Sequence, residues 1–597
     1  MSPAAANPMR KIPRFPASRL SFLSALFSAA IVCAAVSALA DEVFPKDGWV
    51  PRPSPDANPL APKGGTLTTQ LGPYPKSLNY YLDCNTMSAE VFSMLYEPLL
   101  TQNDETLENE PWLADRWTVS DDGMEFTFHL SDKARWSDGE PVTAEDVAWT
   151  YGAVMDPGSL TGPHKISLGR FDPPEVLDPA TVRFRAHERH WENLLALGGM
   201  AVLPKHAYAG GDFNLLNFEF PVVSGPYAIE RLDDGVLLSL RRRRDWWAAD
   251  DPRVAGQFNF DLLRYRFFED RSNAFDAFLR GDLDLFAVYT AHRWATQTDG
   301  KKFRRGWIVK KEIANRKPVG FQGIALNMRR PPLDDARVRL ALAKLFDRRR
   351  MNETLMANAY TLHRSYYEDL YETPPREPVA FDPAGAAALL REAGWTRDAA
   401  TGALVKDGKK MALSWLSRGS TDDKFVAVFR EALSAQGIEL AVDRKDWSAW
   451  AKDMDTYAFC MTWCAWSGGR FKDPESMWYS EEGAREGGQN LTGFADARVD
   501  ELVRAARTEE SAAKRHETVK KIDAILCRET PYILLWFAES TRLCFWNRFG
   551  MPEKMLGTFG DESAARRLWW HDPEAARALA EAQEKDRDLP PPFGVAP

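Results

Sequence analysis

The sequence predicts an α/β protein that carries a β-rich block in its first part. Residues 117–130, WTVSDDGMEFTFHL, form two alternating strands joined by Asp121-Asp122-Gly123, which is a strong hairpin signal. Residues 332–350, PLDDARVRLALAKLFDRRR, form the clearest helix, in which Asp334 or Asp335 can cap the start and arginines fill the last turn. Helical and strand-like segments alternate after residue 383, which is typical of a mixed lobe whose last element returns to an earlier sheet.

The N-terminus has the pattern of an exported protein. Basic residues precede an apolar run from Leu20 to Val36, and Ala38-Leu39-Ala40 provides a cleavage site before Asp41. We expect residues 1–40 to be a signal peptide and the proline-rich residues 41–63 to be an extended lead-in. Cys33 lies inside the apolar run, so we expect no lipid anchor.

Residues 134–147, ARWSDGEPVTAEDV, place an aromatic side chain, a turn and a helix start in one short segment. Gly139 suits a turn with positive φ, and Thr143 with Asp146 forms a capping-box pattern. The apolar residues that follow, Val147 and Tyr151 among them, share one helical face. We predict a tight turn followed by a buried helix, with a structural role.

The next part of the chain repeats this α/β character. Residues 272–286, SNAFDAFLRGDLDLF, predict a helix that stops at Gly281 before another strand. The run Arg241–Arg244 ends a strand-like segment, and we expect it to be solvated or at a strand edge rather than to bind an anion. The tail from about His571 is expected to be a mobile, charged helical stretch.

Composition and charge exclude several classes of protein. The chain has 597 residues and a net charge of -9, so it is long enough for two to four domains and lacks the basic balance of a nucleic-acid-binding protein. Five cysteines remain once Cys33 is set aside, and the pairing of Cys527 with Cys544 stays open. His187 and His190 are too close for a helical zinc motif, and we expect neither a metal nor another cofactor.

Several short segments occur in an order that resembles a known family. They are GGTL and SLN near the start, RWSDGEPVTAEDV, SGPY followed by RDWW, RGDLDL, RRPPLDDARVRLALAKLFDR, LLREAGW, QGIEL, NLTGFADARVDELV and TPYILLW. The chain resembles family 5 of the periplasmic solute-binding proteins, the peptide, dipeptide and nickel type that serves ABC importers. Residues 321–347 and 364–368 are most similar to the branch that imports oligopeptides and microcin C.

The resemblance implies a two-lobed periplasmic binding protein fold of class II type, with an extra β-rich domain and three domains around a hinge. Lobe 1 would comprise residues 41–95, 204–315 and 537–597, the inserted β-rich domain residues 96–203, and lobe 2 residues 316–536. A peptide or peptide-like solute would lie between the lobes. The implied partners are that ligand and the permease and ATPase complex of an importer, with the chain itself a non-catalytic periplasmic monomer.

The expected ligand contacts depart from the family pattern. Oligopeptide-binding relatives place a Trp-Cys-Ala-Asp segment in the cleft, where the aspartate meets the α-amino group of the peptide. Here the segment is Trp463-Cys464-Ala465-Trp466, followed by an inserted SGGRFK, so this anchor is missing or moved to Asp473 or Glu475. The resemblance also places Trp447 in the cleft, whereas the positions that neutralise a peptide carboxylate fall on Met454, Asp455 and Cys460.

Residue chemistry adds further candidates. Trp447, Trp463 and Trp466 could form aromatic walls, and the alternative for each is plain core packing. Arg418 and Arg470 could bind a carboxylate or phosphate bidentately, and the alternative for each is an exposed surface role. The candidate ligand contacts are therefore Trp447, Trp463, Cys464, Ala465, Trp466, Arg470, Asp473 and Arg418 from one lobe, and Tyr80 and Tyr81 from the other.

Two other classes of function stay open at this point. An exported hydrolase acting on peptides or glycans would need an activated nucleophile, a metal or a carboxylate pair, and the chain has no GxSxG or HExxH motif. A ligand sensor or chaperone would use the same closure to signal to a membrane partner.

Overall fold

The computed structural model describes residues 41–597 apart from positions 73, 76, 83–85, 216–220 and 593–597. The expected signal peptide and Cys84 lie outside the described residues. None of the helices in the described part is long and apolar enough to cross a bilayer.

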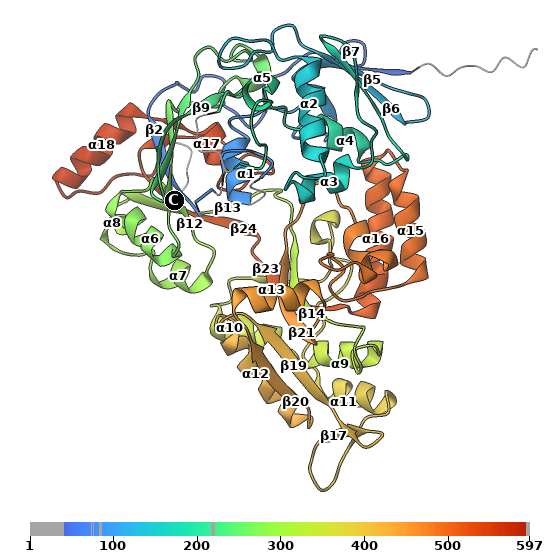
Figure 1. Ribbon diagram of the computed structural model, residues 1–597. Helices are drawn as coiled ribbons and strands as arrows, with labels where there is room; N and C mark the ends of the chain where they lie inside the picture. The colour runs from blue at the N-terminus through green and yellow to red at the C-terminus, as the bar shows by residue number, and fades with distance from the viewer. Residues whose placement is uncertain (1–40, 73, 76, 83–85, 216–220, 593–597) are drawn as a thin grey trace, which may run out of the picture. The chain divides into compact units, whose positions relative to one another are not determined.

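The hairpin predicted at residues 117–130 belongs to a five-stranded antiparallel sheet, which with its helices we call the β-rich domain. Its order is β1 (Glu42–Phe44), β5 (Ala114–Val119), β6 (Glu125–Leu130), β8 (Thr181–Arg185) and β7 (Glu175–Asp178). Gly123 turns the hairpin with a φ of 69°. The helices here are α2 (Ala144–Met155), α3 (Gly162–Leu168), α4 (Asn193–Gly198) and α5 (Lys205–Tyr208), and α2 packs on β7 and β8 (Figure 1).

The first strand lies within the expected extended lead-in of residues 41–63. Residues 42–44 pair antiparallel with β5, and the ring of Phe44 stacks on that of Trp117 with centroids 5.2 Å apart. Aromatic stacking across the strands stabilises this edge. Residues 42–44 therefore belong to the β-rich sheet, although the family resemblance implied that they are part of lobe 1.

The segment ARWSDGEPVTAEDV has the predicted conformation. Gly139 has a φ of 93°. Thr143 Oγ1 accepts from the amide of Asp146, and the Asp146 carboxylate accepts from the amide of Thr143 at 2.8 Å, which completes the capping box at the start of α2. Val147 and Tyr151 are buried, so the helix presents the predicted apolar face to the core.

Two sheets form what we call lobe 1. One has the order β2 (Thr66–Leu71), β11 (Leu262–Phe267), β10 (Leu237–Arg242) and β9 (Tyr227–Asp233); the other is β12 (Leu285–Ala287), β24 (Ser540–Trp546) and β13 (Ile308–Ala314). The helices are α1 (Thr86–Phe92), α6 (Arg271–Arg280), α7 (Ala291–Thr296), α8 (Lys301–Arg304), α17 (Ala564–Leu568) and α18 (Pro573–Glu584). Gly281 ends α6 in the left-handed conformation, as predicted.

The basic run Arg241–Arg244 is neither at a sheet edge nor fully solvated. Strand β10 lies between β9 and β11, so both of its edges are paired. Arg243 is buried and donates to three backbone carbonyls of residues 223–225. The expectation is wrong for this residue because its guanidinium supplies the donors that a neighbouring loop needs.

The C-terminal segment is packed rather than loose. Leu579 and Ala582 of α18 are buried in an apolar cluster with residues of α6 and β12. Beyond the helix, Trp307 Nε1 donates to the carbonyl of Arg587 at 2.9 Å. The prediction of a mobile tail is therefore wrong for these residues, because the apolar face of α18 packs against α6 and β12.

A mixed five-stranded sheet forms what we call lobe 2. Its order is β20 (Glu439–Arg444), β19 (Ala412–Ser417), β21 (Met461–Trp466), β14 (Phe321–Leu326) and β22 (Tyr532–Leu534). The helices are α9 (Ala336–Leu345), α10 (Arg348–Leu355), α11 (Pro383–Glu392), α12 (Asp423–Ala435), α13 (Trp447–Asp455), α14 (Glu475–Trp478), α15 (Ala497–Arg507) and α16 (Ala512–Glu529). The late strand β22 returns to the sheet that β14 begins, which confirms the predicted topology.

Short segments complete the fold. A small sheet joins β16 (Thr396–Arg397), β17 (Leu404–Lys406) and β18 (Lys409–Lys410), and two-stranded pairs join β3 (Leu100–Gln102) to β4 (Asn109–Pro111), β15 (Thr361–Leu362) to β23 (Trp536–Phe537) and β25 (Phe549–Gly550) to β26 (Trp570–His571). Two connections join lobe 1 to lobe 2: residues 315–320 between β13 and β14, and residues 538–539 between β23 and β24.

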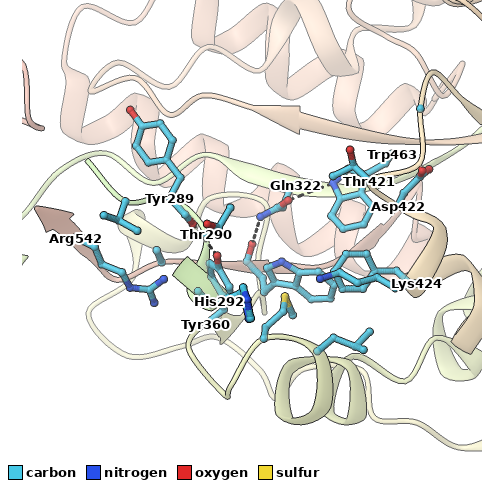
Figure 2. Close-up of a pocket in the computed structure, with 18 of the residues that line it drawn as sticks. Tyr289, Thr290, His292, Gln322, Tyr360, Thr421, Asp422, Lys424, Trp463 and Arg542 are labelled. Carbon is cyan, nitrogen blue, oxygen red and sulfur yellow. Dashed lines mark hydrogen bonds between the residues drawn. The ribbon is translucent and has the colours of Figure 1, made fainter. Parts of the chain in front are cut away.

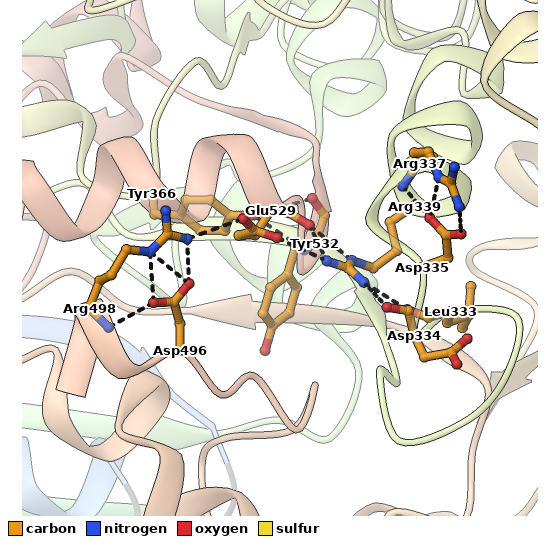
Figure 3. Close-up of polar contacts among 10 residues, drawn as sticks. All are labelled: Leu333, Asp334, Asp335, Arg337, Arg339, Tyr366, Asp496, Arg498, Glu529 and Tyr532. Atoms are coloured by element: carbon orange, nitrogen blue, oxygen red, sulfur yellow. Dashed lines mark hydrogen bonds and ion pairs between the residues drawn. The ribbon is translucent and has the colours of Figure 1, made fainter. Parts of the chain in front are cut away.

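A buried arginine holds two ends of helices in lobe 2 together. Asp335 caps α9 by accepting from the amide of Arg337, as the sequence allowed. One turn later Arg339 donates to the carbonyls of Leu333 and Asp334 and to that of Glu529, the last residue of α16 (Figure 3). The carbonyls of Leu333 and Asp334 lie in the turn before α9, and that of Glu529 belongs to the last turn of α16, where carbonyls have no partner within the helix. The guanidinium satisfies all three and fixes α9 against α16.

The described cysteines are unpaired. Cys460, Cys464, Cys527 and Cys544 are all free thiols, so Cys527 and Cys544 form no disulfide. The described residues also contain no group of His, Cys, Asp or Glu side chains arranged to hold a metal ion.

Candidate functional site

A cavity of about 960 Å³ is lined by residues of both lobes and of the connections between them. Lobe 1 contributes residues 288–292, 540–542 and Glu562; lobe 2 contributes Leu355, Met356 and Tyr360, the end of β19, the start of α12, and side chains of α13, β14 and β21. Lys317 and Ala538 come from the two connections. A cavity of this size suits a small-molecule or short-peptide solute.

Trp463 forms a fixed aromatic wall of this cavity. Its ring packs against Phe425 and Trp536, with centroids 5.2 and 5.6 Å away. Its Nε1 donates to Gln322 Oε1 at 3.2 Å, while Gln322 Nε2 donates to the carbonyl of Trp536 at 2.7 Å (Figure 2). The ring is therefore held in place before any ligand binds, which lowers the entropy cost of binding.

A second aromatic surface carries a basic group. Trp447 and Trp450 of α13 stack with centroids 5.4 Å apart. The guanidinium of Arg418 lies 5.0 Å from the Trp447 ring and 5.2 Å from the Trp450 ring. Trp447 is 61% exposed although it is a large apolar side chain, so a ligand can cover it.

The charged residues of the lining are mostly basic. Lys317, Arg418, Lys424 and Arg542 line the cavity together with two acids, Asp422 and Glu562. Asp422 accepts from Trp415 Nε1 at 2.6 Å and from Ser417 Oγ at 2.9 Å. Glu562 accepts from the hydroxyl of Tyr289, and both acidic groups are therefore already hydrogen-bonded within the protein.

The structure brings three of the predicted ligand residues, Trp447, Trp463 and Arg418, to this cavity. On β21, Thr462 also lines the cavity, whereas Cys464, Ala465 and Trp466 do not. Cys464 and Trp466 point to the opposite face because side chains alternate along a strand, and they pack with a separate apolar cluster. Burial raises the pKa of the Cys464 thiol to about 12. Ala465 is exposed outside the lining.

Arg470 and Asp473 are also not among the lining residues. Arg470 lies over the ring of Phe559 at 4.0 Å and donates to the carbonyl of Glu105 at 3.5 Å. Burial, with a smaller contribution from the nearby carboxylates of Glu192 and Glu475, raises the pKa of Asp473 to about 6. The inserted segment thus turns these side chains toward lobe 1 and the β-rich domain.

Tyr80 and Tyr81 pack in the core instead of the cavity. Their rings are in edge contact at 4.7 Å, and the Tyr81 hydroxyl donates to the carbonyl of Ala201 at 2.6 Å. Tyr81 is 1% exposed. Neither tyrosine is among the residues that line this cavity: Tyr81 is buried, and Tyr80 is partly buried with its ring against Phe92 of α1.

Several lining residues were missed from sequence. Trp450 follows Trp447 by three positions and so shares its helical face, a signal that was available. Tyr289, Arg542 and Glu562 come from segments far apart in the chain, and no local pattern links them.

The comparisons with known proteins agree with this architecture. The model of the bacterial extracellular solute-binding proteins, family 5 middle, matches residues 108–488. The YejA protein of Escherichia coli (strain K12) is 26% identical over 568 residues, 88% of this chain and 92% of that protein. A probable peptide-binding protein YejA of Agrobacterium fabrum is 25% identical over 545 residues, 83% of this chain and 88% of its own length.

Solved structures show the same fold. The oligopeptide-binding protein AppA of Bacillus subtilis, in complex with a nonapeptide, superimposes with a TM-score of 0.66 at 21% identity, covering 86% of this chain and 99% of AppA. The match has the two-lobed architecture that the sequence resemblance implied. This chain belongs to family 5 of the bacterial extracellular solute-binding proteins.

Proposed function

We propose that the protein is the extracytoplasmic substrate-binding component of an ABC importer, and that it captures a peptide-like solute in the cavity between its lobes. The observation that carries the proposal is the cavity of about 960 Å³ with walls from both lobes and from their two connections. The peptide bound to AppA and the name of the Agrobacterium relative support a peptide-like solute.

The mechanism follows from where the lining residues are attached. Lobe 1 carries Tyr289 and Arg542, lobe 2 carries Trp463 and Arg418, and a solute that touches both sets is bound fully only when the lobes are together. A ligand shifts a conformational equilibrium only by its difference in affinity for the two states. With the solute bound, the protein would then present the closed arrangement of its two lobes to a membrane permease.

The hydrolase alternative has little support in the cavity. Ser417 is the serine beside the carboxylate of Asp422, and its hydroxyl donates to that carboxylate and to the carbonyl of Gly419 instead of to a histidine. The one lining histidine, His292, comes from α7 of the other lobe. The lining therefore lacks the paired nucleophile and base that acyl transfer needs.

Export, cleavage after residue 40 and a monomeric state complete the proposal, and the domain boundaries given above remain part of it except at residues 42–44, which pair with the β-rich sheet. Because the chain matches this family, we favour delivery of the solute to a permease over signalling to a membrane sensor.

The test is native mass spectrometry of the protein purified from its own periplasm, with Trp463→Ala and Arg418→Gln in parallel. We expect the wild-type chain to carry a peptide-like adduct and both variants to lose it. An adduct that both variants retain would contradict the assignment of the cavity, and catalytic turnover of a peptide library by the wild type alone would favour the hydrolase.

A further inference from the structure

Three of the four basic residues of the cavity lining lack acidic partners among the described residues. Among the residues that the structure describes, no carboxylate pairs with Lys317, Arg418 or Lys424. Arg542 has one acidic neighbour, Glu312, whose carboxylate lies 3.4 Å from Nε and belongs to no lining residue. The chain as a whole carries a net charge of -9, so this basic interior runs against the overall balance.

The basic groups are also arranged to receive a ligand. Arg418 rests its planar face on Trp447 and Trp450, which leaves the N–H groups at the edge of the guanidinium for a carboxylate or a phosphate. Lys424 Nζ lies 4.9 Å from the centre of the Phe425 ring, and Phe425 packs against Trp463. Arg542 lies near Tyr360 on the other side of the cavity, 5.1 Å from its ring (Figure 2).

We propose that the cavity selects anionic solutes, with a carboxylate or phosphate group between Arg418 and Lys424 and a flat apolar group against Trp463. This proposal rests on the proposed function and deepens it by naming the charge class of the ligand. Both acidic lining groups already accept hydrogen bonds within the protein, so they offer fewer open acceptor positions to a cationic ligand than the four basic groups offer donors to an anionic one.

The test uses three probes that share an indole ring and differ in charge: indole-3-acetate, indole-3-ethanol and tryptamine. Affinities are measured by ligand-observed NMR titration of the wild type, of Arg418→Gln/Lys424→Gln, and of Lys409→Gln/Lys410→Gln. The last variant removes two exposed lysines of β18, outside the cavity lining, and is the matched control.

We expect indole-3-acetate to bind about tenfold more tightly than indole-3-ethanol, because its carboxylate can form two exposed ion pairs that each contribute modestly. Tryptamine should bind most weakly, because its ammonium group is repelled by the basic residues. The cavity variant should lose this order and the control should keep it. Equal affinities, or tighter binding of tryptamine, would overturn the charge preference while leaving the cavity as a solute site. Binding of none of the three probes would overturn both assignments.

An independent set of contacts involves the inserted residues 467–472, which we call the interlobe strap. Gly468 lies against the connection at residues 315–320, since a Cβ there would come 2.5 Å from the carbonyl carbon of Val319. Lys472 pairs with Asp369 at 2.6 Å, and Asp369 also accepts from the amide of Val319 at 3.2 Å. The strap is thus fixed to lobe 2 beside a connection between the lobes.

From this base the strap reaches the other parts of the protein. Arg470 covers Phe559 of lobe 1 and donates to the carbonyl of Glu105 in the β-rich domain. The ring of Phe471 lies 5.9 Å from that of Trp191, whose amide donates to the carbonyl of Arg507 in lobe 2 at 2.8 Å. None of these residues lines the cavity.

Polar groups surround the same contact. Arg515 lies over the Trp191 ring at 4.1 Å, and Glu475 binds Arg507 at 2.6 Å. His190 Nε2 lies 3.7 Å from the Glu475 carboxylate, and Arg189 pairs with Glu510 at 3.1 Å. The β-rich domain and lobe 2 are therefore joined by an aromatic contact with ion pairs around it.

We infer that the interlobe strap holds the lobes in contact without any ligand, so that closure is partly built into the chain. Hydrogen exchange of the Trp191 amide in ligand-free protein tests this, because that amide is bonded across the contact. Phe471→Ala and Arg470→Ala are compared with Phe381→Ala, an exposed phenylalanine of lobe 2.

In the wild type we expect slow exchange of the Trp191 amide, accelerated about tenfold or more in each strap variant and unchanged in Phe381→Ala. Exchange at the rate of an unstructured peptide in the wild type would overturn the inference. An unchanged exchange rate in Arg470→Ala would also overturn the inference. Because Arg470→Ala removes only partly exposed contacts, this variant keeps the test decisive if Phe471→Ala does not fold.

Discussion

Glu97 offers a quantitative test of the packing between lobe 1 and the β-rich domain. Its side chain is 3% exposed. One carboxylate oxygen accepts from Trp112 Nε1 at 3.1 Å and Trp246 Nε1 at 3.0 Å, and the other accepts from Trp247 Nε1 at 2.7 Å. Burial raises the pKa of Glu97 from 4.5 to about 7, although the three indole donors and Arg243 oppose that shift.

The sign of the pH effect follows from this shift. Because the folded pKa lies above the unfolded value, the folded state binds the proton more tightly, and the resulting stability is complete below pH 4.5 and lost as the pH rises through about 7. Each unit of pKa shift corresponds to ~1.36 kcal/mol, so the full effect is about 3 kcal/mol. Between pH 5 and pH 8 it amounts to about 2–3 kcal/mol.

The perturbation is Glu97→Gln, and the assay is urea unfolding followed by circular dichroism at pH 5 and pH 8. The free energy of unfolding of the wild type, minus that of the variant, should fall by about 2–3 kcal/mol between these two values, since other titrations cancel in the difference. Glu108→Gln, at an exposed position, should show no such change. A difference between wild type and Glu97→Gln that is the same at both pH values would refute the reasoning.

Three further predictions concern other parts of the structure. Arg339→Met leaves the carbonyls of Leu333, Asp334 and Glu529 without this donor and should lower the free energy of unfolding by about 2–4 kcal/mol in urea titrations. A loss below about 1 kcal/mol would contradict the proposed fixing of α9 against α16 by this side chain (Figure 3). Gly281→Ala places a side chain on a left-handed cap residue and should lower the free energy of unfolding by about 1 kcal/mol. Gly152→Ala lies inside α2 with open space around it and should raise the free energy of unfolding by about 0.5–1 kcal/mol; calorimetry measures both. Trp463→Ala should weaken binding of the co-purified solute about tenfold or more in fluorescence titrations, and an unchanged dissociation constant would remove this ring from the site.

Features set by near neighbours in the sequence could be predicted. The capping box of Thr143 and Asp146, the hairpin at Gly123 and the helix stop at Gly281 each depend on a few adjacent residues, and all three are confirmed. The order of short motifs along the chain was enough to indicate the family. Local chemistry and motif order therefore gave the fold class.

Features set by distant segments could not be predicted. Arg243 is buried because a loop twenty residues earlier in the chain needs donors, as its bond to the carbonyl of Val223 shows. Tyr289, Arg542 and Glu562 meet in the cavity from three separate segments of lobe 1. Arg470 is turned away from the cavity by contacts with Phe559, which no spacing in the sequence links to it.

The unpaired thiols have a practical consequence for spectroscopy. Burial raises the pKa of Cys544 to about 12 and also raises that of Cys460, and together with Cys464 these thiols stay protonated and shielded at neutral pH. Because the thiolate is the species that reacts with maleimides, such groups react slowly. A cysteine introduced on the outer surface of each lobe would thus react with dyes faster than these three thiols do, and the distance between two dyes would follow opening and closing in single molecules.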